Sequence, residues 1–245
     1  MKIKLCFLLL MVCLVIPTHA VSNYKPVVYH AYITNSVGDW KKVIDKMSSD
    51  KNVDNAQKLE LLNYEYGYVG WCVVNNKDKE AQHYLDHAVK LAEELEKEKY
   101  ELSQIMAYKA ALWGFQIALS YYKAPFLGFE CVDFAKQSVQ LNKNHYLGYL
   151  QMGYIDFFLP SVFGGSKTRA INNYIIAEKL LEKQLNGSLK DWNYINILVT
   201  IVQACQSLGQ NAKAKVYHDK VMKVEPTYKW AKSDLIDNLQ NRTKN

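Results

Sequence analysis

The chain has 245 residues, of which 49% are hydrophobic and 22% are charged, and this balance excludes collagen-like, low-complexity and wholly disordered proteins. Only 11 residues are Gly and 5 are Pro, which favours an all-α fold over a turn-rich β-sandwich or β-barrel. The formal net charge is +6, yet Arg169 and Arg242 are the only arginines. Because the planar guanidinium group that reads phosphate and guanine is nearly absent, we expect no nucleic-acid partner.

Residues 1–20 have the pattern of a secretory signal peptide. Two lysines precede an apolar run from Leu5 to Ile16, and the small residue Ala20 closes the segment. The apolar run is shorter than the roughly 20 residues that a membrane-spanning helix needs, so a retained anchor is the less favoured alternative. We therefore expect an exported protein, in the periplasm or cell envelope of a bacterium or secreted, with no stable membrane anchor after removal of the signal.

Residues 21–245 contain no Pro-, Gly- or Ser-rich linker, so we expect one domain. Within it, four segments carry apolar or small residues at offsets of 0, +4, +7 and +11, the stripe of a helix that packs on one neighbour. The sets are Ala81, Leu85, Ala88, Ala92; Gly128, Val132, Ala135, Val139; Ala170, Tyr174, Ala177, Leu181; and Ala214, His218, Val221, with Glu225 breaking the last set. This repetition predicts an array of helix pairs.

Turn residues separate the predicted helices of each pair. Asn76, Gly165 and Gly209 each stand five positions before the leading small residue of a set. Gly and Asn are the residues that end helices in the left-handed conformation, because that conformation strains most other side chains. The predicted unit is helix, tight turn, helix.

The first helices of three pairs contain an interior glycine, namely Gly70, Gly114 and Gly153. A glycine inside a helix costs about 1 kcal/mol relative to alanine. Its occurrence in three helices predicts that each of these glycines allows a neighbouring helix to approach closely.

The last pair resembles a tetratricopeptide repeat. The residues that carry the resemblance are Gly209-Gln-Asn-Ala-Lys-Ala214, Tyr217, Val221 and Glu225-Pro226. The resemblance covers the chain from about Tyr29 to Leu239 and implies a right-handed solenoid of antiparallel helix pairs, about five pairs plus a final helix. The leading small residues are 47, 42 and 44 positions apart, whereas the standard repeat has about 34 residues, so longer helices or looser joins are expected.

A second, shorter resemblance lies in the segment that begins the predicted helix at Ala170. Gly164, Gly165, Lys167 and Ala170 match a pattern similar to that of the soluble T-component of some TRAP transporters, an exported bacterial repeat family. This resemblance supports bacterial export. It leaves a role in an uptake system as an alternative.

Histidine and cysteine patterns point to structure rather than chemistry. His83 and His87 lie one helical turn apart, but the glutamate of a zinc-protease helix is missing, so we expect surface histidines and no metal. Cys72, Cys131 and Cys205 are expected to be small core residues, with one disulfide as the alternative. No nucleophile, Walker or dinucleotide motif is present, so we expect neither an enzyme nor a cofactor. An enzyme on a helical-repeat frame, with catalytic residues dispersed along the chain, is a third hypothesis.

Aromatic content is high, with 18 tyrosines. If the interior glycines sit at the glycine position of the repeat, five aromatic residues are expected on the inner, concave wall of the solenoid, where they would bind a partner: Tyr64, Trp71, Tyr108, Phe115 and Tyr154. The alternative is that these side chains fill the core.

The sequence therefore predicts a non-catalytic scaffold that binds a protein or peptide in a concave groove, since repeat arrays build such surfaces. A small-ligand carrier or accessory of an envelope uptake system, with an aromatic pocket, is the alternative.

Overall fold

A computed structural model describes residues 23–228. Ten α-helices and two short 3₁₀ turns account for its regular structure, so within these residues the all-α prediction is confirmed. The helices are α1 (Lys25–Thr34), α2 (Val37–Ser49), α3 (Asn55–Val74), α4 (Asp78–Lys97), α5 (Leu102–Leu119), α6 (Ala124–Leu141), α7 (Tyr146–Phe158), α8 (Lys167–Leu185), α9 (Trp192–Ser207) and α10 (Asn211–Val224), and the 3₁₀ turns are η1 (Tyr121–Lys123) and η2 (Ser161–Phe163). The predicted signal peptide, residues 1–20, and the predicted final helix ending near Leu239 lie outside the described residues.

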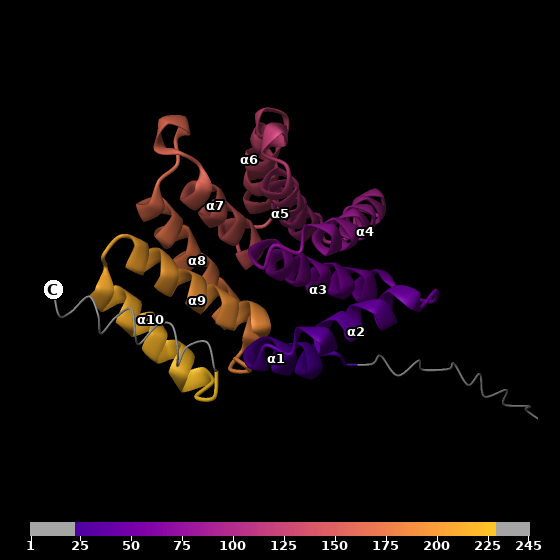
Figure 1. Cartoon of the computed structure of the whole chain (residues 1–245), viewed down its shortest axis with the longest axis horizontal. Coiled ribbons are helices and arrows are strands. Elements are labelled where there is room, and N and C mark those ends of the chain that lie inside the picture. The colour runs from indigo at the N-terminus through magenta and orange to yellow at the C-terminus, as the bar shows by residue number, and fades with distance from the viewer. Residues whose placement is uncertain (1–22, 229–245) are drawn as a thin grey trace, which may run out of the picture.

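The helices pack as sequential antiparallel pairs, as predicted for a helical-repeat solenoid (Figure 1). Each helix packs on the next one in the chain, and the odd-numbered helices also connect neighbouring pairs, α3 with α5 and α5 with α7. In addition, α1 contacts α9. The first and last pairs therefore meet, and the odd-numbered helices surround the middle of the molecule. No helix of the described part combines the length and apolarity needed to cross a membrane.

Several helices begin at a residue that caps them. Asp54 accepts a hydrogen bond from the backbone N–H of Gln57, whose side chain accepts one from the Asp54 N–H, which forms a capping box at the start of α3. The Ser166 hydroxyl accepts a hydrogen bond from the N–H of Arg169 at 3.3 Å and so caps the start of α8. At the other end of the array, α10 stops at Val224, just before Pro226.

The predicted turns are present, with one change of position. Asn76 and Gly209 have φ angles of 55° and 69°, in the left-handed region. Before α8 the left-handed residue is Gly164, with a φ of 95°, and not Gly165 as predicted. Gly165 is required for a different reason, because a Cβ atom there would lie 1.7 Å from the carbonyl oxygen of Leu159.

The interior glycines differ from one another in their surroundings. A Cβ atom on Gly153 would lie 2.4 Å from the Tyr174 ring, so α7 and α8 approach closely there, whereas no atom lies within 4 Å of a Cβ on Gly114. The expectation of a close approach at Gly114 is therefore wrong, since that face of α5 is open. Gly70 is intermediate, at 3.3 Å from the Phe115 ring. The sequence pattern did not single out Gly67, yet its surroundings are tighter than those of Gly70. A Cβ atom on Gly67 would lie 2.6 Å from the Trp192 ring.

Small residues occupy the contacts between helices, in agreement with the predicted stripes. Ala81, Ala170, Ala177 and Ala214 are each fully buried. The three cysteines of the described part, Cys72, Cys131 and Cys205, are also buried and form no disulfide with one another. Burial raises the pKa of the Cys131 thiol to about 12, so it stays protonated.

Candidate functional site

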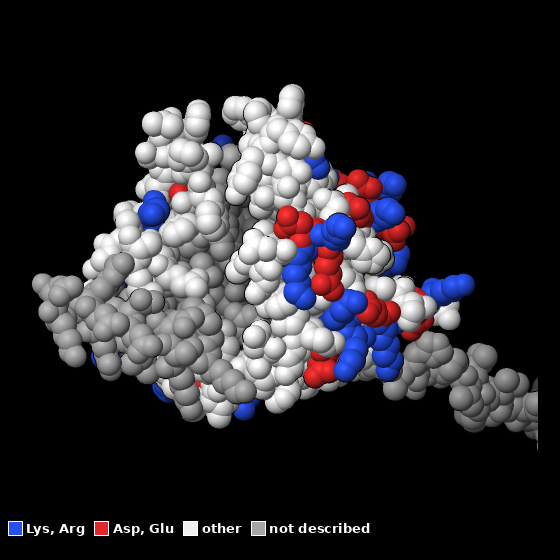
Figure 2. Space-filling model, in the orientation of Figure 1, with Lys and Arg blue, Asp and Glu red and all other residues white. Residues whose placement is uncertain are grey.

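A cleft runs into the molecule between the α5–α6 and α7–α8 pairs. Figure 2 shows it as a hollow between two lobes, and comparison with Figure 1 places its mouth between the turn that joins α5 to α6 and the turn that joins α7 to α8. We call this hollow the inner cleft.

Aromatic side chains fill the middle of the molecule where α1, α2, α3 and α9 meet. The centroid of the Trp192 ring lies 4.9 Å from that of Trp40, 6.0 Å from Tyr32 and 6.3 Å from Tyr66. Gly67 on α3 makes this packing possible, since a Cβ there would lie 2.6 Å from Trp192 and 2.7 Å from Trp40. This aromatic hub closes part of the concave face, so the groove is shorter than an open solenoid would provide.

The structure places the five predicted groove residues in different environments. Tyr64 and Tyr108 are only 1% and 2% exposed, so neither side chain is accessible to a ligand, which corrects the prediction for both. The Tyr64 hydroxyl donates to Glu60, and the Tyr108 hydroxyl donates to Asn63 Oδ1 at 3.0 Å. Both rings therefore fill the core, which is the alternative that the sequence left open.

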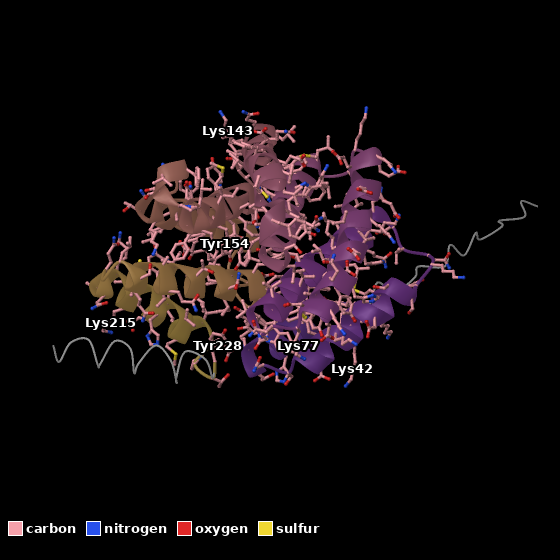
Figure 3. All side chains as sticks on the ribbon, turned by 45° about the horizontal axis from the view of Figure 1, so that its top comes forward. Lys42, Lys77, Lys143, Tyr154, Lys215 and Tyr228 are labelled. Atoms are coloured by element: carbon pink, nitrogen blue, oxygen red, sulfur yellow. The ribbon has the colours of Figure 1, made fainter. Side chains whose placement is uncertain are left out.

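The other three predicted groove residues are partly exposed and have different neighbours. Trp71 stacks on Tyr68, and the Lys77 ammonium group lies 5.0 Å from the Trp71 ring centroid, at the turn between α3 and α4. Phe115 packs on the Tyr66 ring with centroids 5.8 Å apart. Tyr154 lies in the interior between α7 and α9, as Figure 3 shows.

A cluster of hydroxyl and amide groups surrounds Tyr154. The Tyr154 hydroxyl lies 3.3 Å from Thr200 Oγ1 and accepts from Asn196 Nδ2 at 3.3 Å, while the Tyr32 hydroxyl donates to Asn196 Oδ1 at 3.2 Å. Nearby, the Tyr66 hydroxyl accepts from Gln151 at 3.4 Å, and its interaction with Tyr154 contributes to its raised pKa. We define the hydroxyl cluster as this group: Tyr32, Tyr66, Gln151, Tyr154, Asn196 and Thr200.

The partly exposed members of the hydroxyl cluster, which are Tyr32, Tyr154, Asn196 and Thr200, are able to bind polar groups of a ligand, whereas Tyr66 and Gln151 are buried beside them. Its internal hydrogen bonds are near the upper limit of length, so they are weak, and each hydroxyl both donates and accepts. Burial raises the pKa of Tyr32 and Tyr66 well above the ordinary value for tyrosine, so both remain protonated donors. Because the cluster offers phenol, hydroxyl and amide oxygens and nitrogens, it is suited to hydrogen bonding rather than to holding a metal ion.

The sequence identified only Tyr154 in this cluster. Asn196 and Thr200 lie one turn apart on α9, but no spacing along the chain relates them to Tyr32 on α1 or to Tyr66 on α3. They meet because α1 packs on α9, a contact between the two ends of the array. A cluster formed in this way has no local sequence signal.

The predicted surface histidines differ in their contacts. His87 Nδ1 lies 2.6 Å from Glu65 Oε1, and Glu65 is buried on α3. His83 instead packs its ring against Tyr84. Among residues 23–228 no three His, Cys, Asp or Glu side chains are grouped closely enough to hold a metal ion.

The Glu65–His87 pair predicts a pH dependence of stability. The hydrogen bond with Glu65 raises the pKa of His87 above 6.5, and burial raises the pKa of Glu65 above 4.5. Because both groups bind protons more tightly in the folded state, the stabilisation is complete below the unfolded values and is lost as pH rises through the folded ones. We expect the melting temperature to fall as the pH rises above about 6.5, the ordinary pKa of histidine, and to fall less steeply in His87→Gln. Equal slopes in the two proteins would contradict this assignment.

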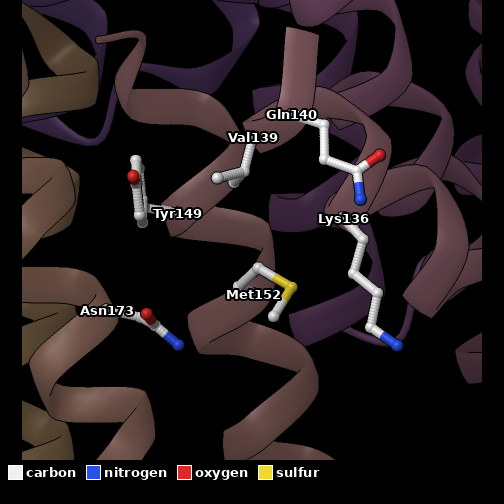
Figure 4. Close-up of a pocket in the computed structure, with 6 residues that line it drawn as sticks. All are labelled: Lys136, Val139, Gln140, Tyr149, Met152 and Asn173. Atoms are coloured by element: carbon white, nitrogen blue, oxygen red, sulfur yellow. The ribbon is translucent and has the colours of Figure 1, made fainter. Parts of the chain in front are cut away.

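A second concave feature, which we call the outer pocket, is formed by α6, α7 and α8. Figure 4 shows its lining, and its volume is about 250 Å³. Small-molecule sites usually have about 300–1,000 Å³, and this pocket is slightly smaller than that. Its lining residues are Lys136, Val139, Gln140, Tyr149, Met152 and Asn173.

Comparison with known proteins supports the fold. No protein-family model and no curated protein sequence matches the chain. Among solved structures, a structure described as the HusA haemophore from Porphyromonas gingivalis is similar, with a TM-score of 0.59 and 12% sequence identity over 76% of this chain and 94% of that chain. The chain therefore shares the all-helical fold of the HusA haemophore.

Proposed function

We propose that this protein is an exported, non-catalytic binding protein whose inner cleft takes a flat, mainly apolar molecule of the porphyrin class. The observation that carries the proposal is the hydroxyl cluster at the centre of the molecule, bordered by aromatic rings. The shared fold with a protein described as a haemophore supports the same ligand class.

The residues at the cleft match the two chemical parts of such a ligand. The partly exposed rings of Phe115 and Tyr154 offer apolar faces on which a flat molecule can stack. The hydroxyl and amide groups of Tyr154, Asn196 and Thr200 can bond to carboxylates at its edge. Since this recognition uses the ring and its edge, we expect metal-free and iron-containing porphyrins to bind with similar affinity.

A compact ligand fits this geometry better than an extended peptide, the first hypothesis from the sequence. A peptide in a repeat groove needs a long open concave surface. Here the α1–α9 contact and the aromatic hub close part of that surface. The carrier hypothesis is therefore the better supported, and the cell envelope is the location that we propose for it.

The direct test is a titration of residues 21–245 with haemin and with protoporphyrin IX. Binding is followed by the porphyrin absorbance band and by quenching of tryptophan fluorescence, because Trp40 and Trp192 lie close to the cluster. We expect saturable binding of both porphyrins with one ligand per chain. Failure of both to bind would reject the proposal, and binding of haemin alone would show that a metal ligand outside the hydroxyl cluster is involved.

Substitutions on α7 locate the site. We expect Tyr154→Ala to weaken porphyrin binding by about tenfold or more, since a buried aromatic anchor contributes at least about 1–2 kcal/mol, and Tyr154→Phe to weaken it less. Tyr149→Ala is the matched control, because Tyr149 lies on the same helix but lines the outer pocket. A loss of binding in Tyr149→Ala with none in Tyr154→Ala would place the ligand in the outer pocket instead.

A further inference from the structure

Two turns at one end of the molecule expose large apolar side chains. One consists of η1 and the beginning of α6, and the other of the end of α7 and η2, and both lie at the top of Figure 1. We call them the aromatic loops. Their exposed apolar residues are between 74% and 83% exposed: Tyr121, Tyr122, Phe126, Phe129, Phe158, Val162 and Phe163.

This exposure is concentrated at one place. Within residues 23–228 every phenylalanine that is largely exposed lies in the aromatic loops, whereas Phe115, Phe134 and Phe157 are partly buried against the core. Contiguous exposed apolar surface in a protein without a partner is unfavourable, and it usually marks a binding surface. The aromatic loops therefore require an explanation beyond the packing of the fold.

The charges of the loops have one sign. Lys123 and Lys167 lie in or beside the loops, and no Asp or Glu occurs in residues 119–129 or 157–168. The acids at their borders have partners, since Glu130 accepts a hydrogen bond from Trp113 Nε1 at 2.6 Å and Asp156 pairs with Arg169. Figure 2 shows this end as mostly uncharged, while mixed charges gather over α2 and α4.

We propose that the aromatic loops bind the surface of a lipid bilayer that carries anionic headgroups. Tyrosine rings favour the headgroup level of a bilayer, phenylalanine rings favour its acyl boundary, and nearby lysines attract anionic lipids. The loops form two separate projections with a cleft between them, a shape that two insertion points in a fluid surface accommodate and that a flat protein interface does not. Bound in this way, the protein directs the mouth of the inner cleft toward the bilayer.

The experiment measures binding of the full mature chain to vesicles in the absence of porphyrin. We expect the protein to sediment with vesicles that contain phosphatidylglycerol, more weakly with pure phosphatidylcholine, and less at high salt, since salt screens the lysines. The double variants Phe126→Ser/Phe129→Ser and Val162→Ser/Phe163→Ser should each reduce partitioning by about tenfold or more, because two apolar side chains no longer leave water.

The control variant changes exposed apolar residues at the opposite end of the molecule. Val27→Ser/Val216→Ser alters α1 and α10, where the two valines are 44% and 58% exposed, and it should bind vesicles as the wild type does. The proposal is overturned if the wild type does not bind phosphatidylglycerol vesicles, or if the loop variants bind as well as the control. It is also overturned if analytical ultracentrifugation shows a wild-type dimer that the loop variants abolish without a change in vesicle binding.

The membrane-binding proposal goes beyond the proposed function, and an experiment can reject either one without rejecting the other. The loop variants keep the hydroxyl cluster and should bind porphyrin in solution as the wild type does. If vesicle binding alone is absent, the proposed role of the aromatic loops is wrong. If porphyrin binding alone is absent, the proposed function of the inner cleft is wrong.

Discussion

Gly153→Ala is expected to destabilise the protein, whereas Gly114→Ala is expected to stabilise it. The added methyl group of Gly153→Ala would lie 2.4 Å from the ring of Tyr174, which is itself fully buried and has no room to move. Overpacking of this kind costs about 1–3 kcal/mol in the free energy of unfolding. The methyl group of Gly114→Ala meets no atom within 4 Å, so it keeps the gain of about 0.5–1 kcal/mol that alanine has over glycine inside a helix.

Urea unfolding of the wild type and the two variants measures both effects, with the midpoint and the slope fitted together. The two substitutions add the same methyl group to interior helix positions, so each is a control for the other. Loss of stability in both variants would mean that α5 is packed at Gly114. A gain in both would mean that α7 and α8 are farther apart at Gly153 than the structure shows.

Asp156→Ala is expected to cause a comparable or larger loss, because Asp156 holds the α7–α8 turn together. Its buried carboxylate accepts from Arg169 Nε at 2.8 Å and from Asn173 Nδ2 at 3.0 Å. Arg169 also donates to the carbonyl oxygen of Gly164, so one carboxylate positions both ends of the turn. Loss of hydrogen bonds to a charged group costs about 1.5–3 kcal/mol, and the exposure of Arg169 keeps the expected loss below that of a fully buried ion pair.

The control for this variant is Asp219→Ala, which removes an exposed ion pair with Lys215. Exposed pairs of this kind contribute about 0–1 kcal/mol, so little change is expected. Thermal unfolding of both variants, followed by circular dichroism, gives the comparison. Similar small changes in the two would show that the Asp156 network contributes no more than a surface ion pair.

The helix pairs could be predicted from the sequence because their signals are local. The buried stripe that begins at Ala81 or Ala170 repeats with the period of a helix, and Asn76 and Gly209 end helices through their own backbone preferences. The interior glycines were harder to interpret. The same residue type gives open space at Gly114 and a close contact at Gly153, because the neighbour that decides between them lies on another helix.

The candidate site could not be predicted in the same way. Of the five expected groove residues, Tyr64 and Tyr108 are buried and Trp71 lies at the α3–α4 turn, while Phe115 and Tyr154 are partly buried against the core. Helical periodicity shows that a residue is on the same face as others of its helix. It does not show whether the next helix covers that face.

The helices, their turns and their pairing follow from local features of the sequence, because periodicity, capping residues and small-residue contacts act over a few residues. Which side chains meet at the centre depends instead on how the helix pairs stack on one another. The curvature accumulated over five pairs brings α1 onto α9, and that closure places Tyr32, Tyr66, Tyr154 and Asn196 within one hydroxyl cluster. Curvature is the sum of small rotations between neighbouring pairs, and no single segment of the chain encodes that sum.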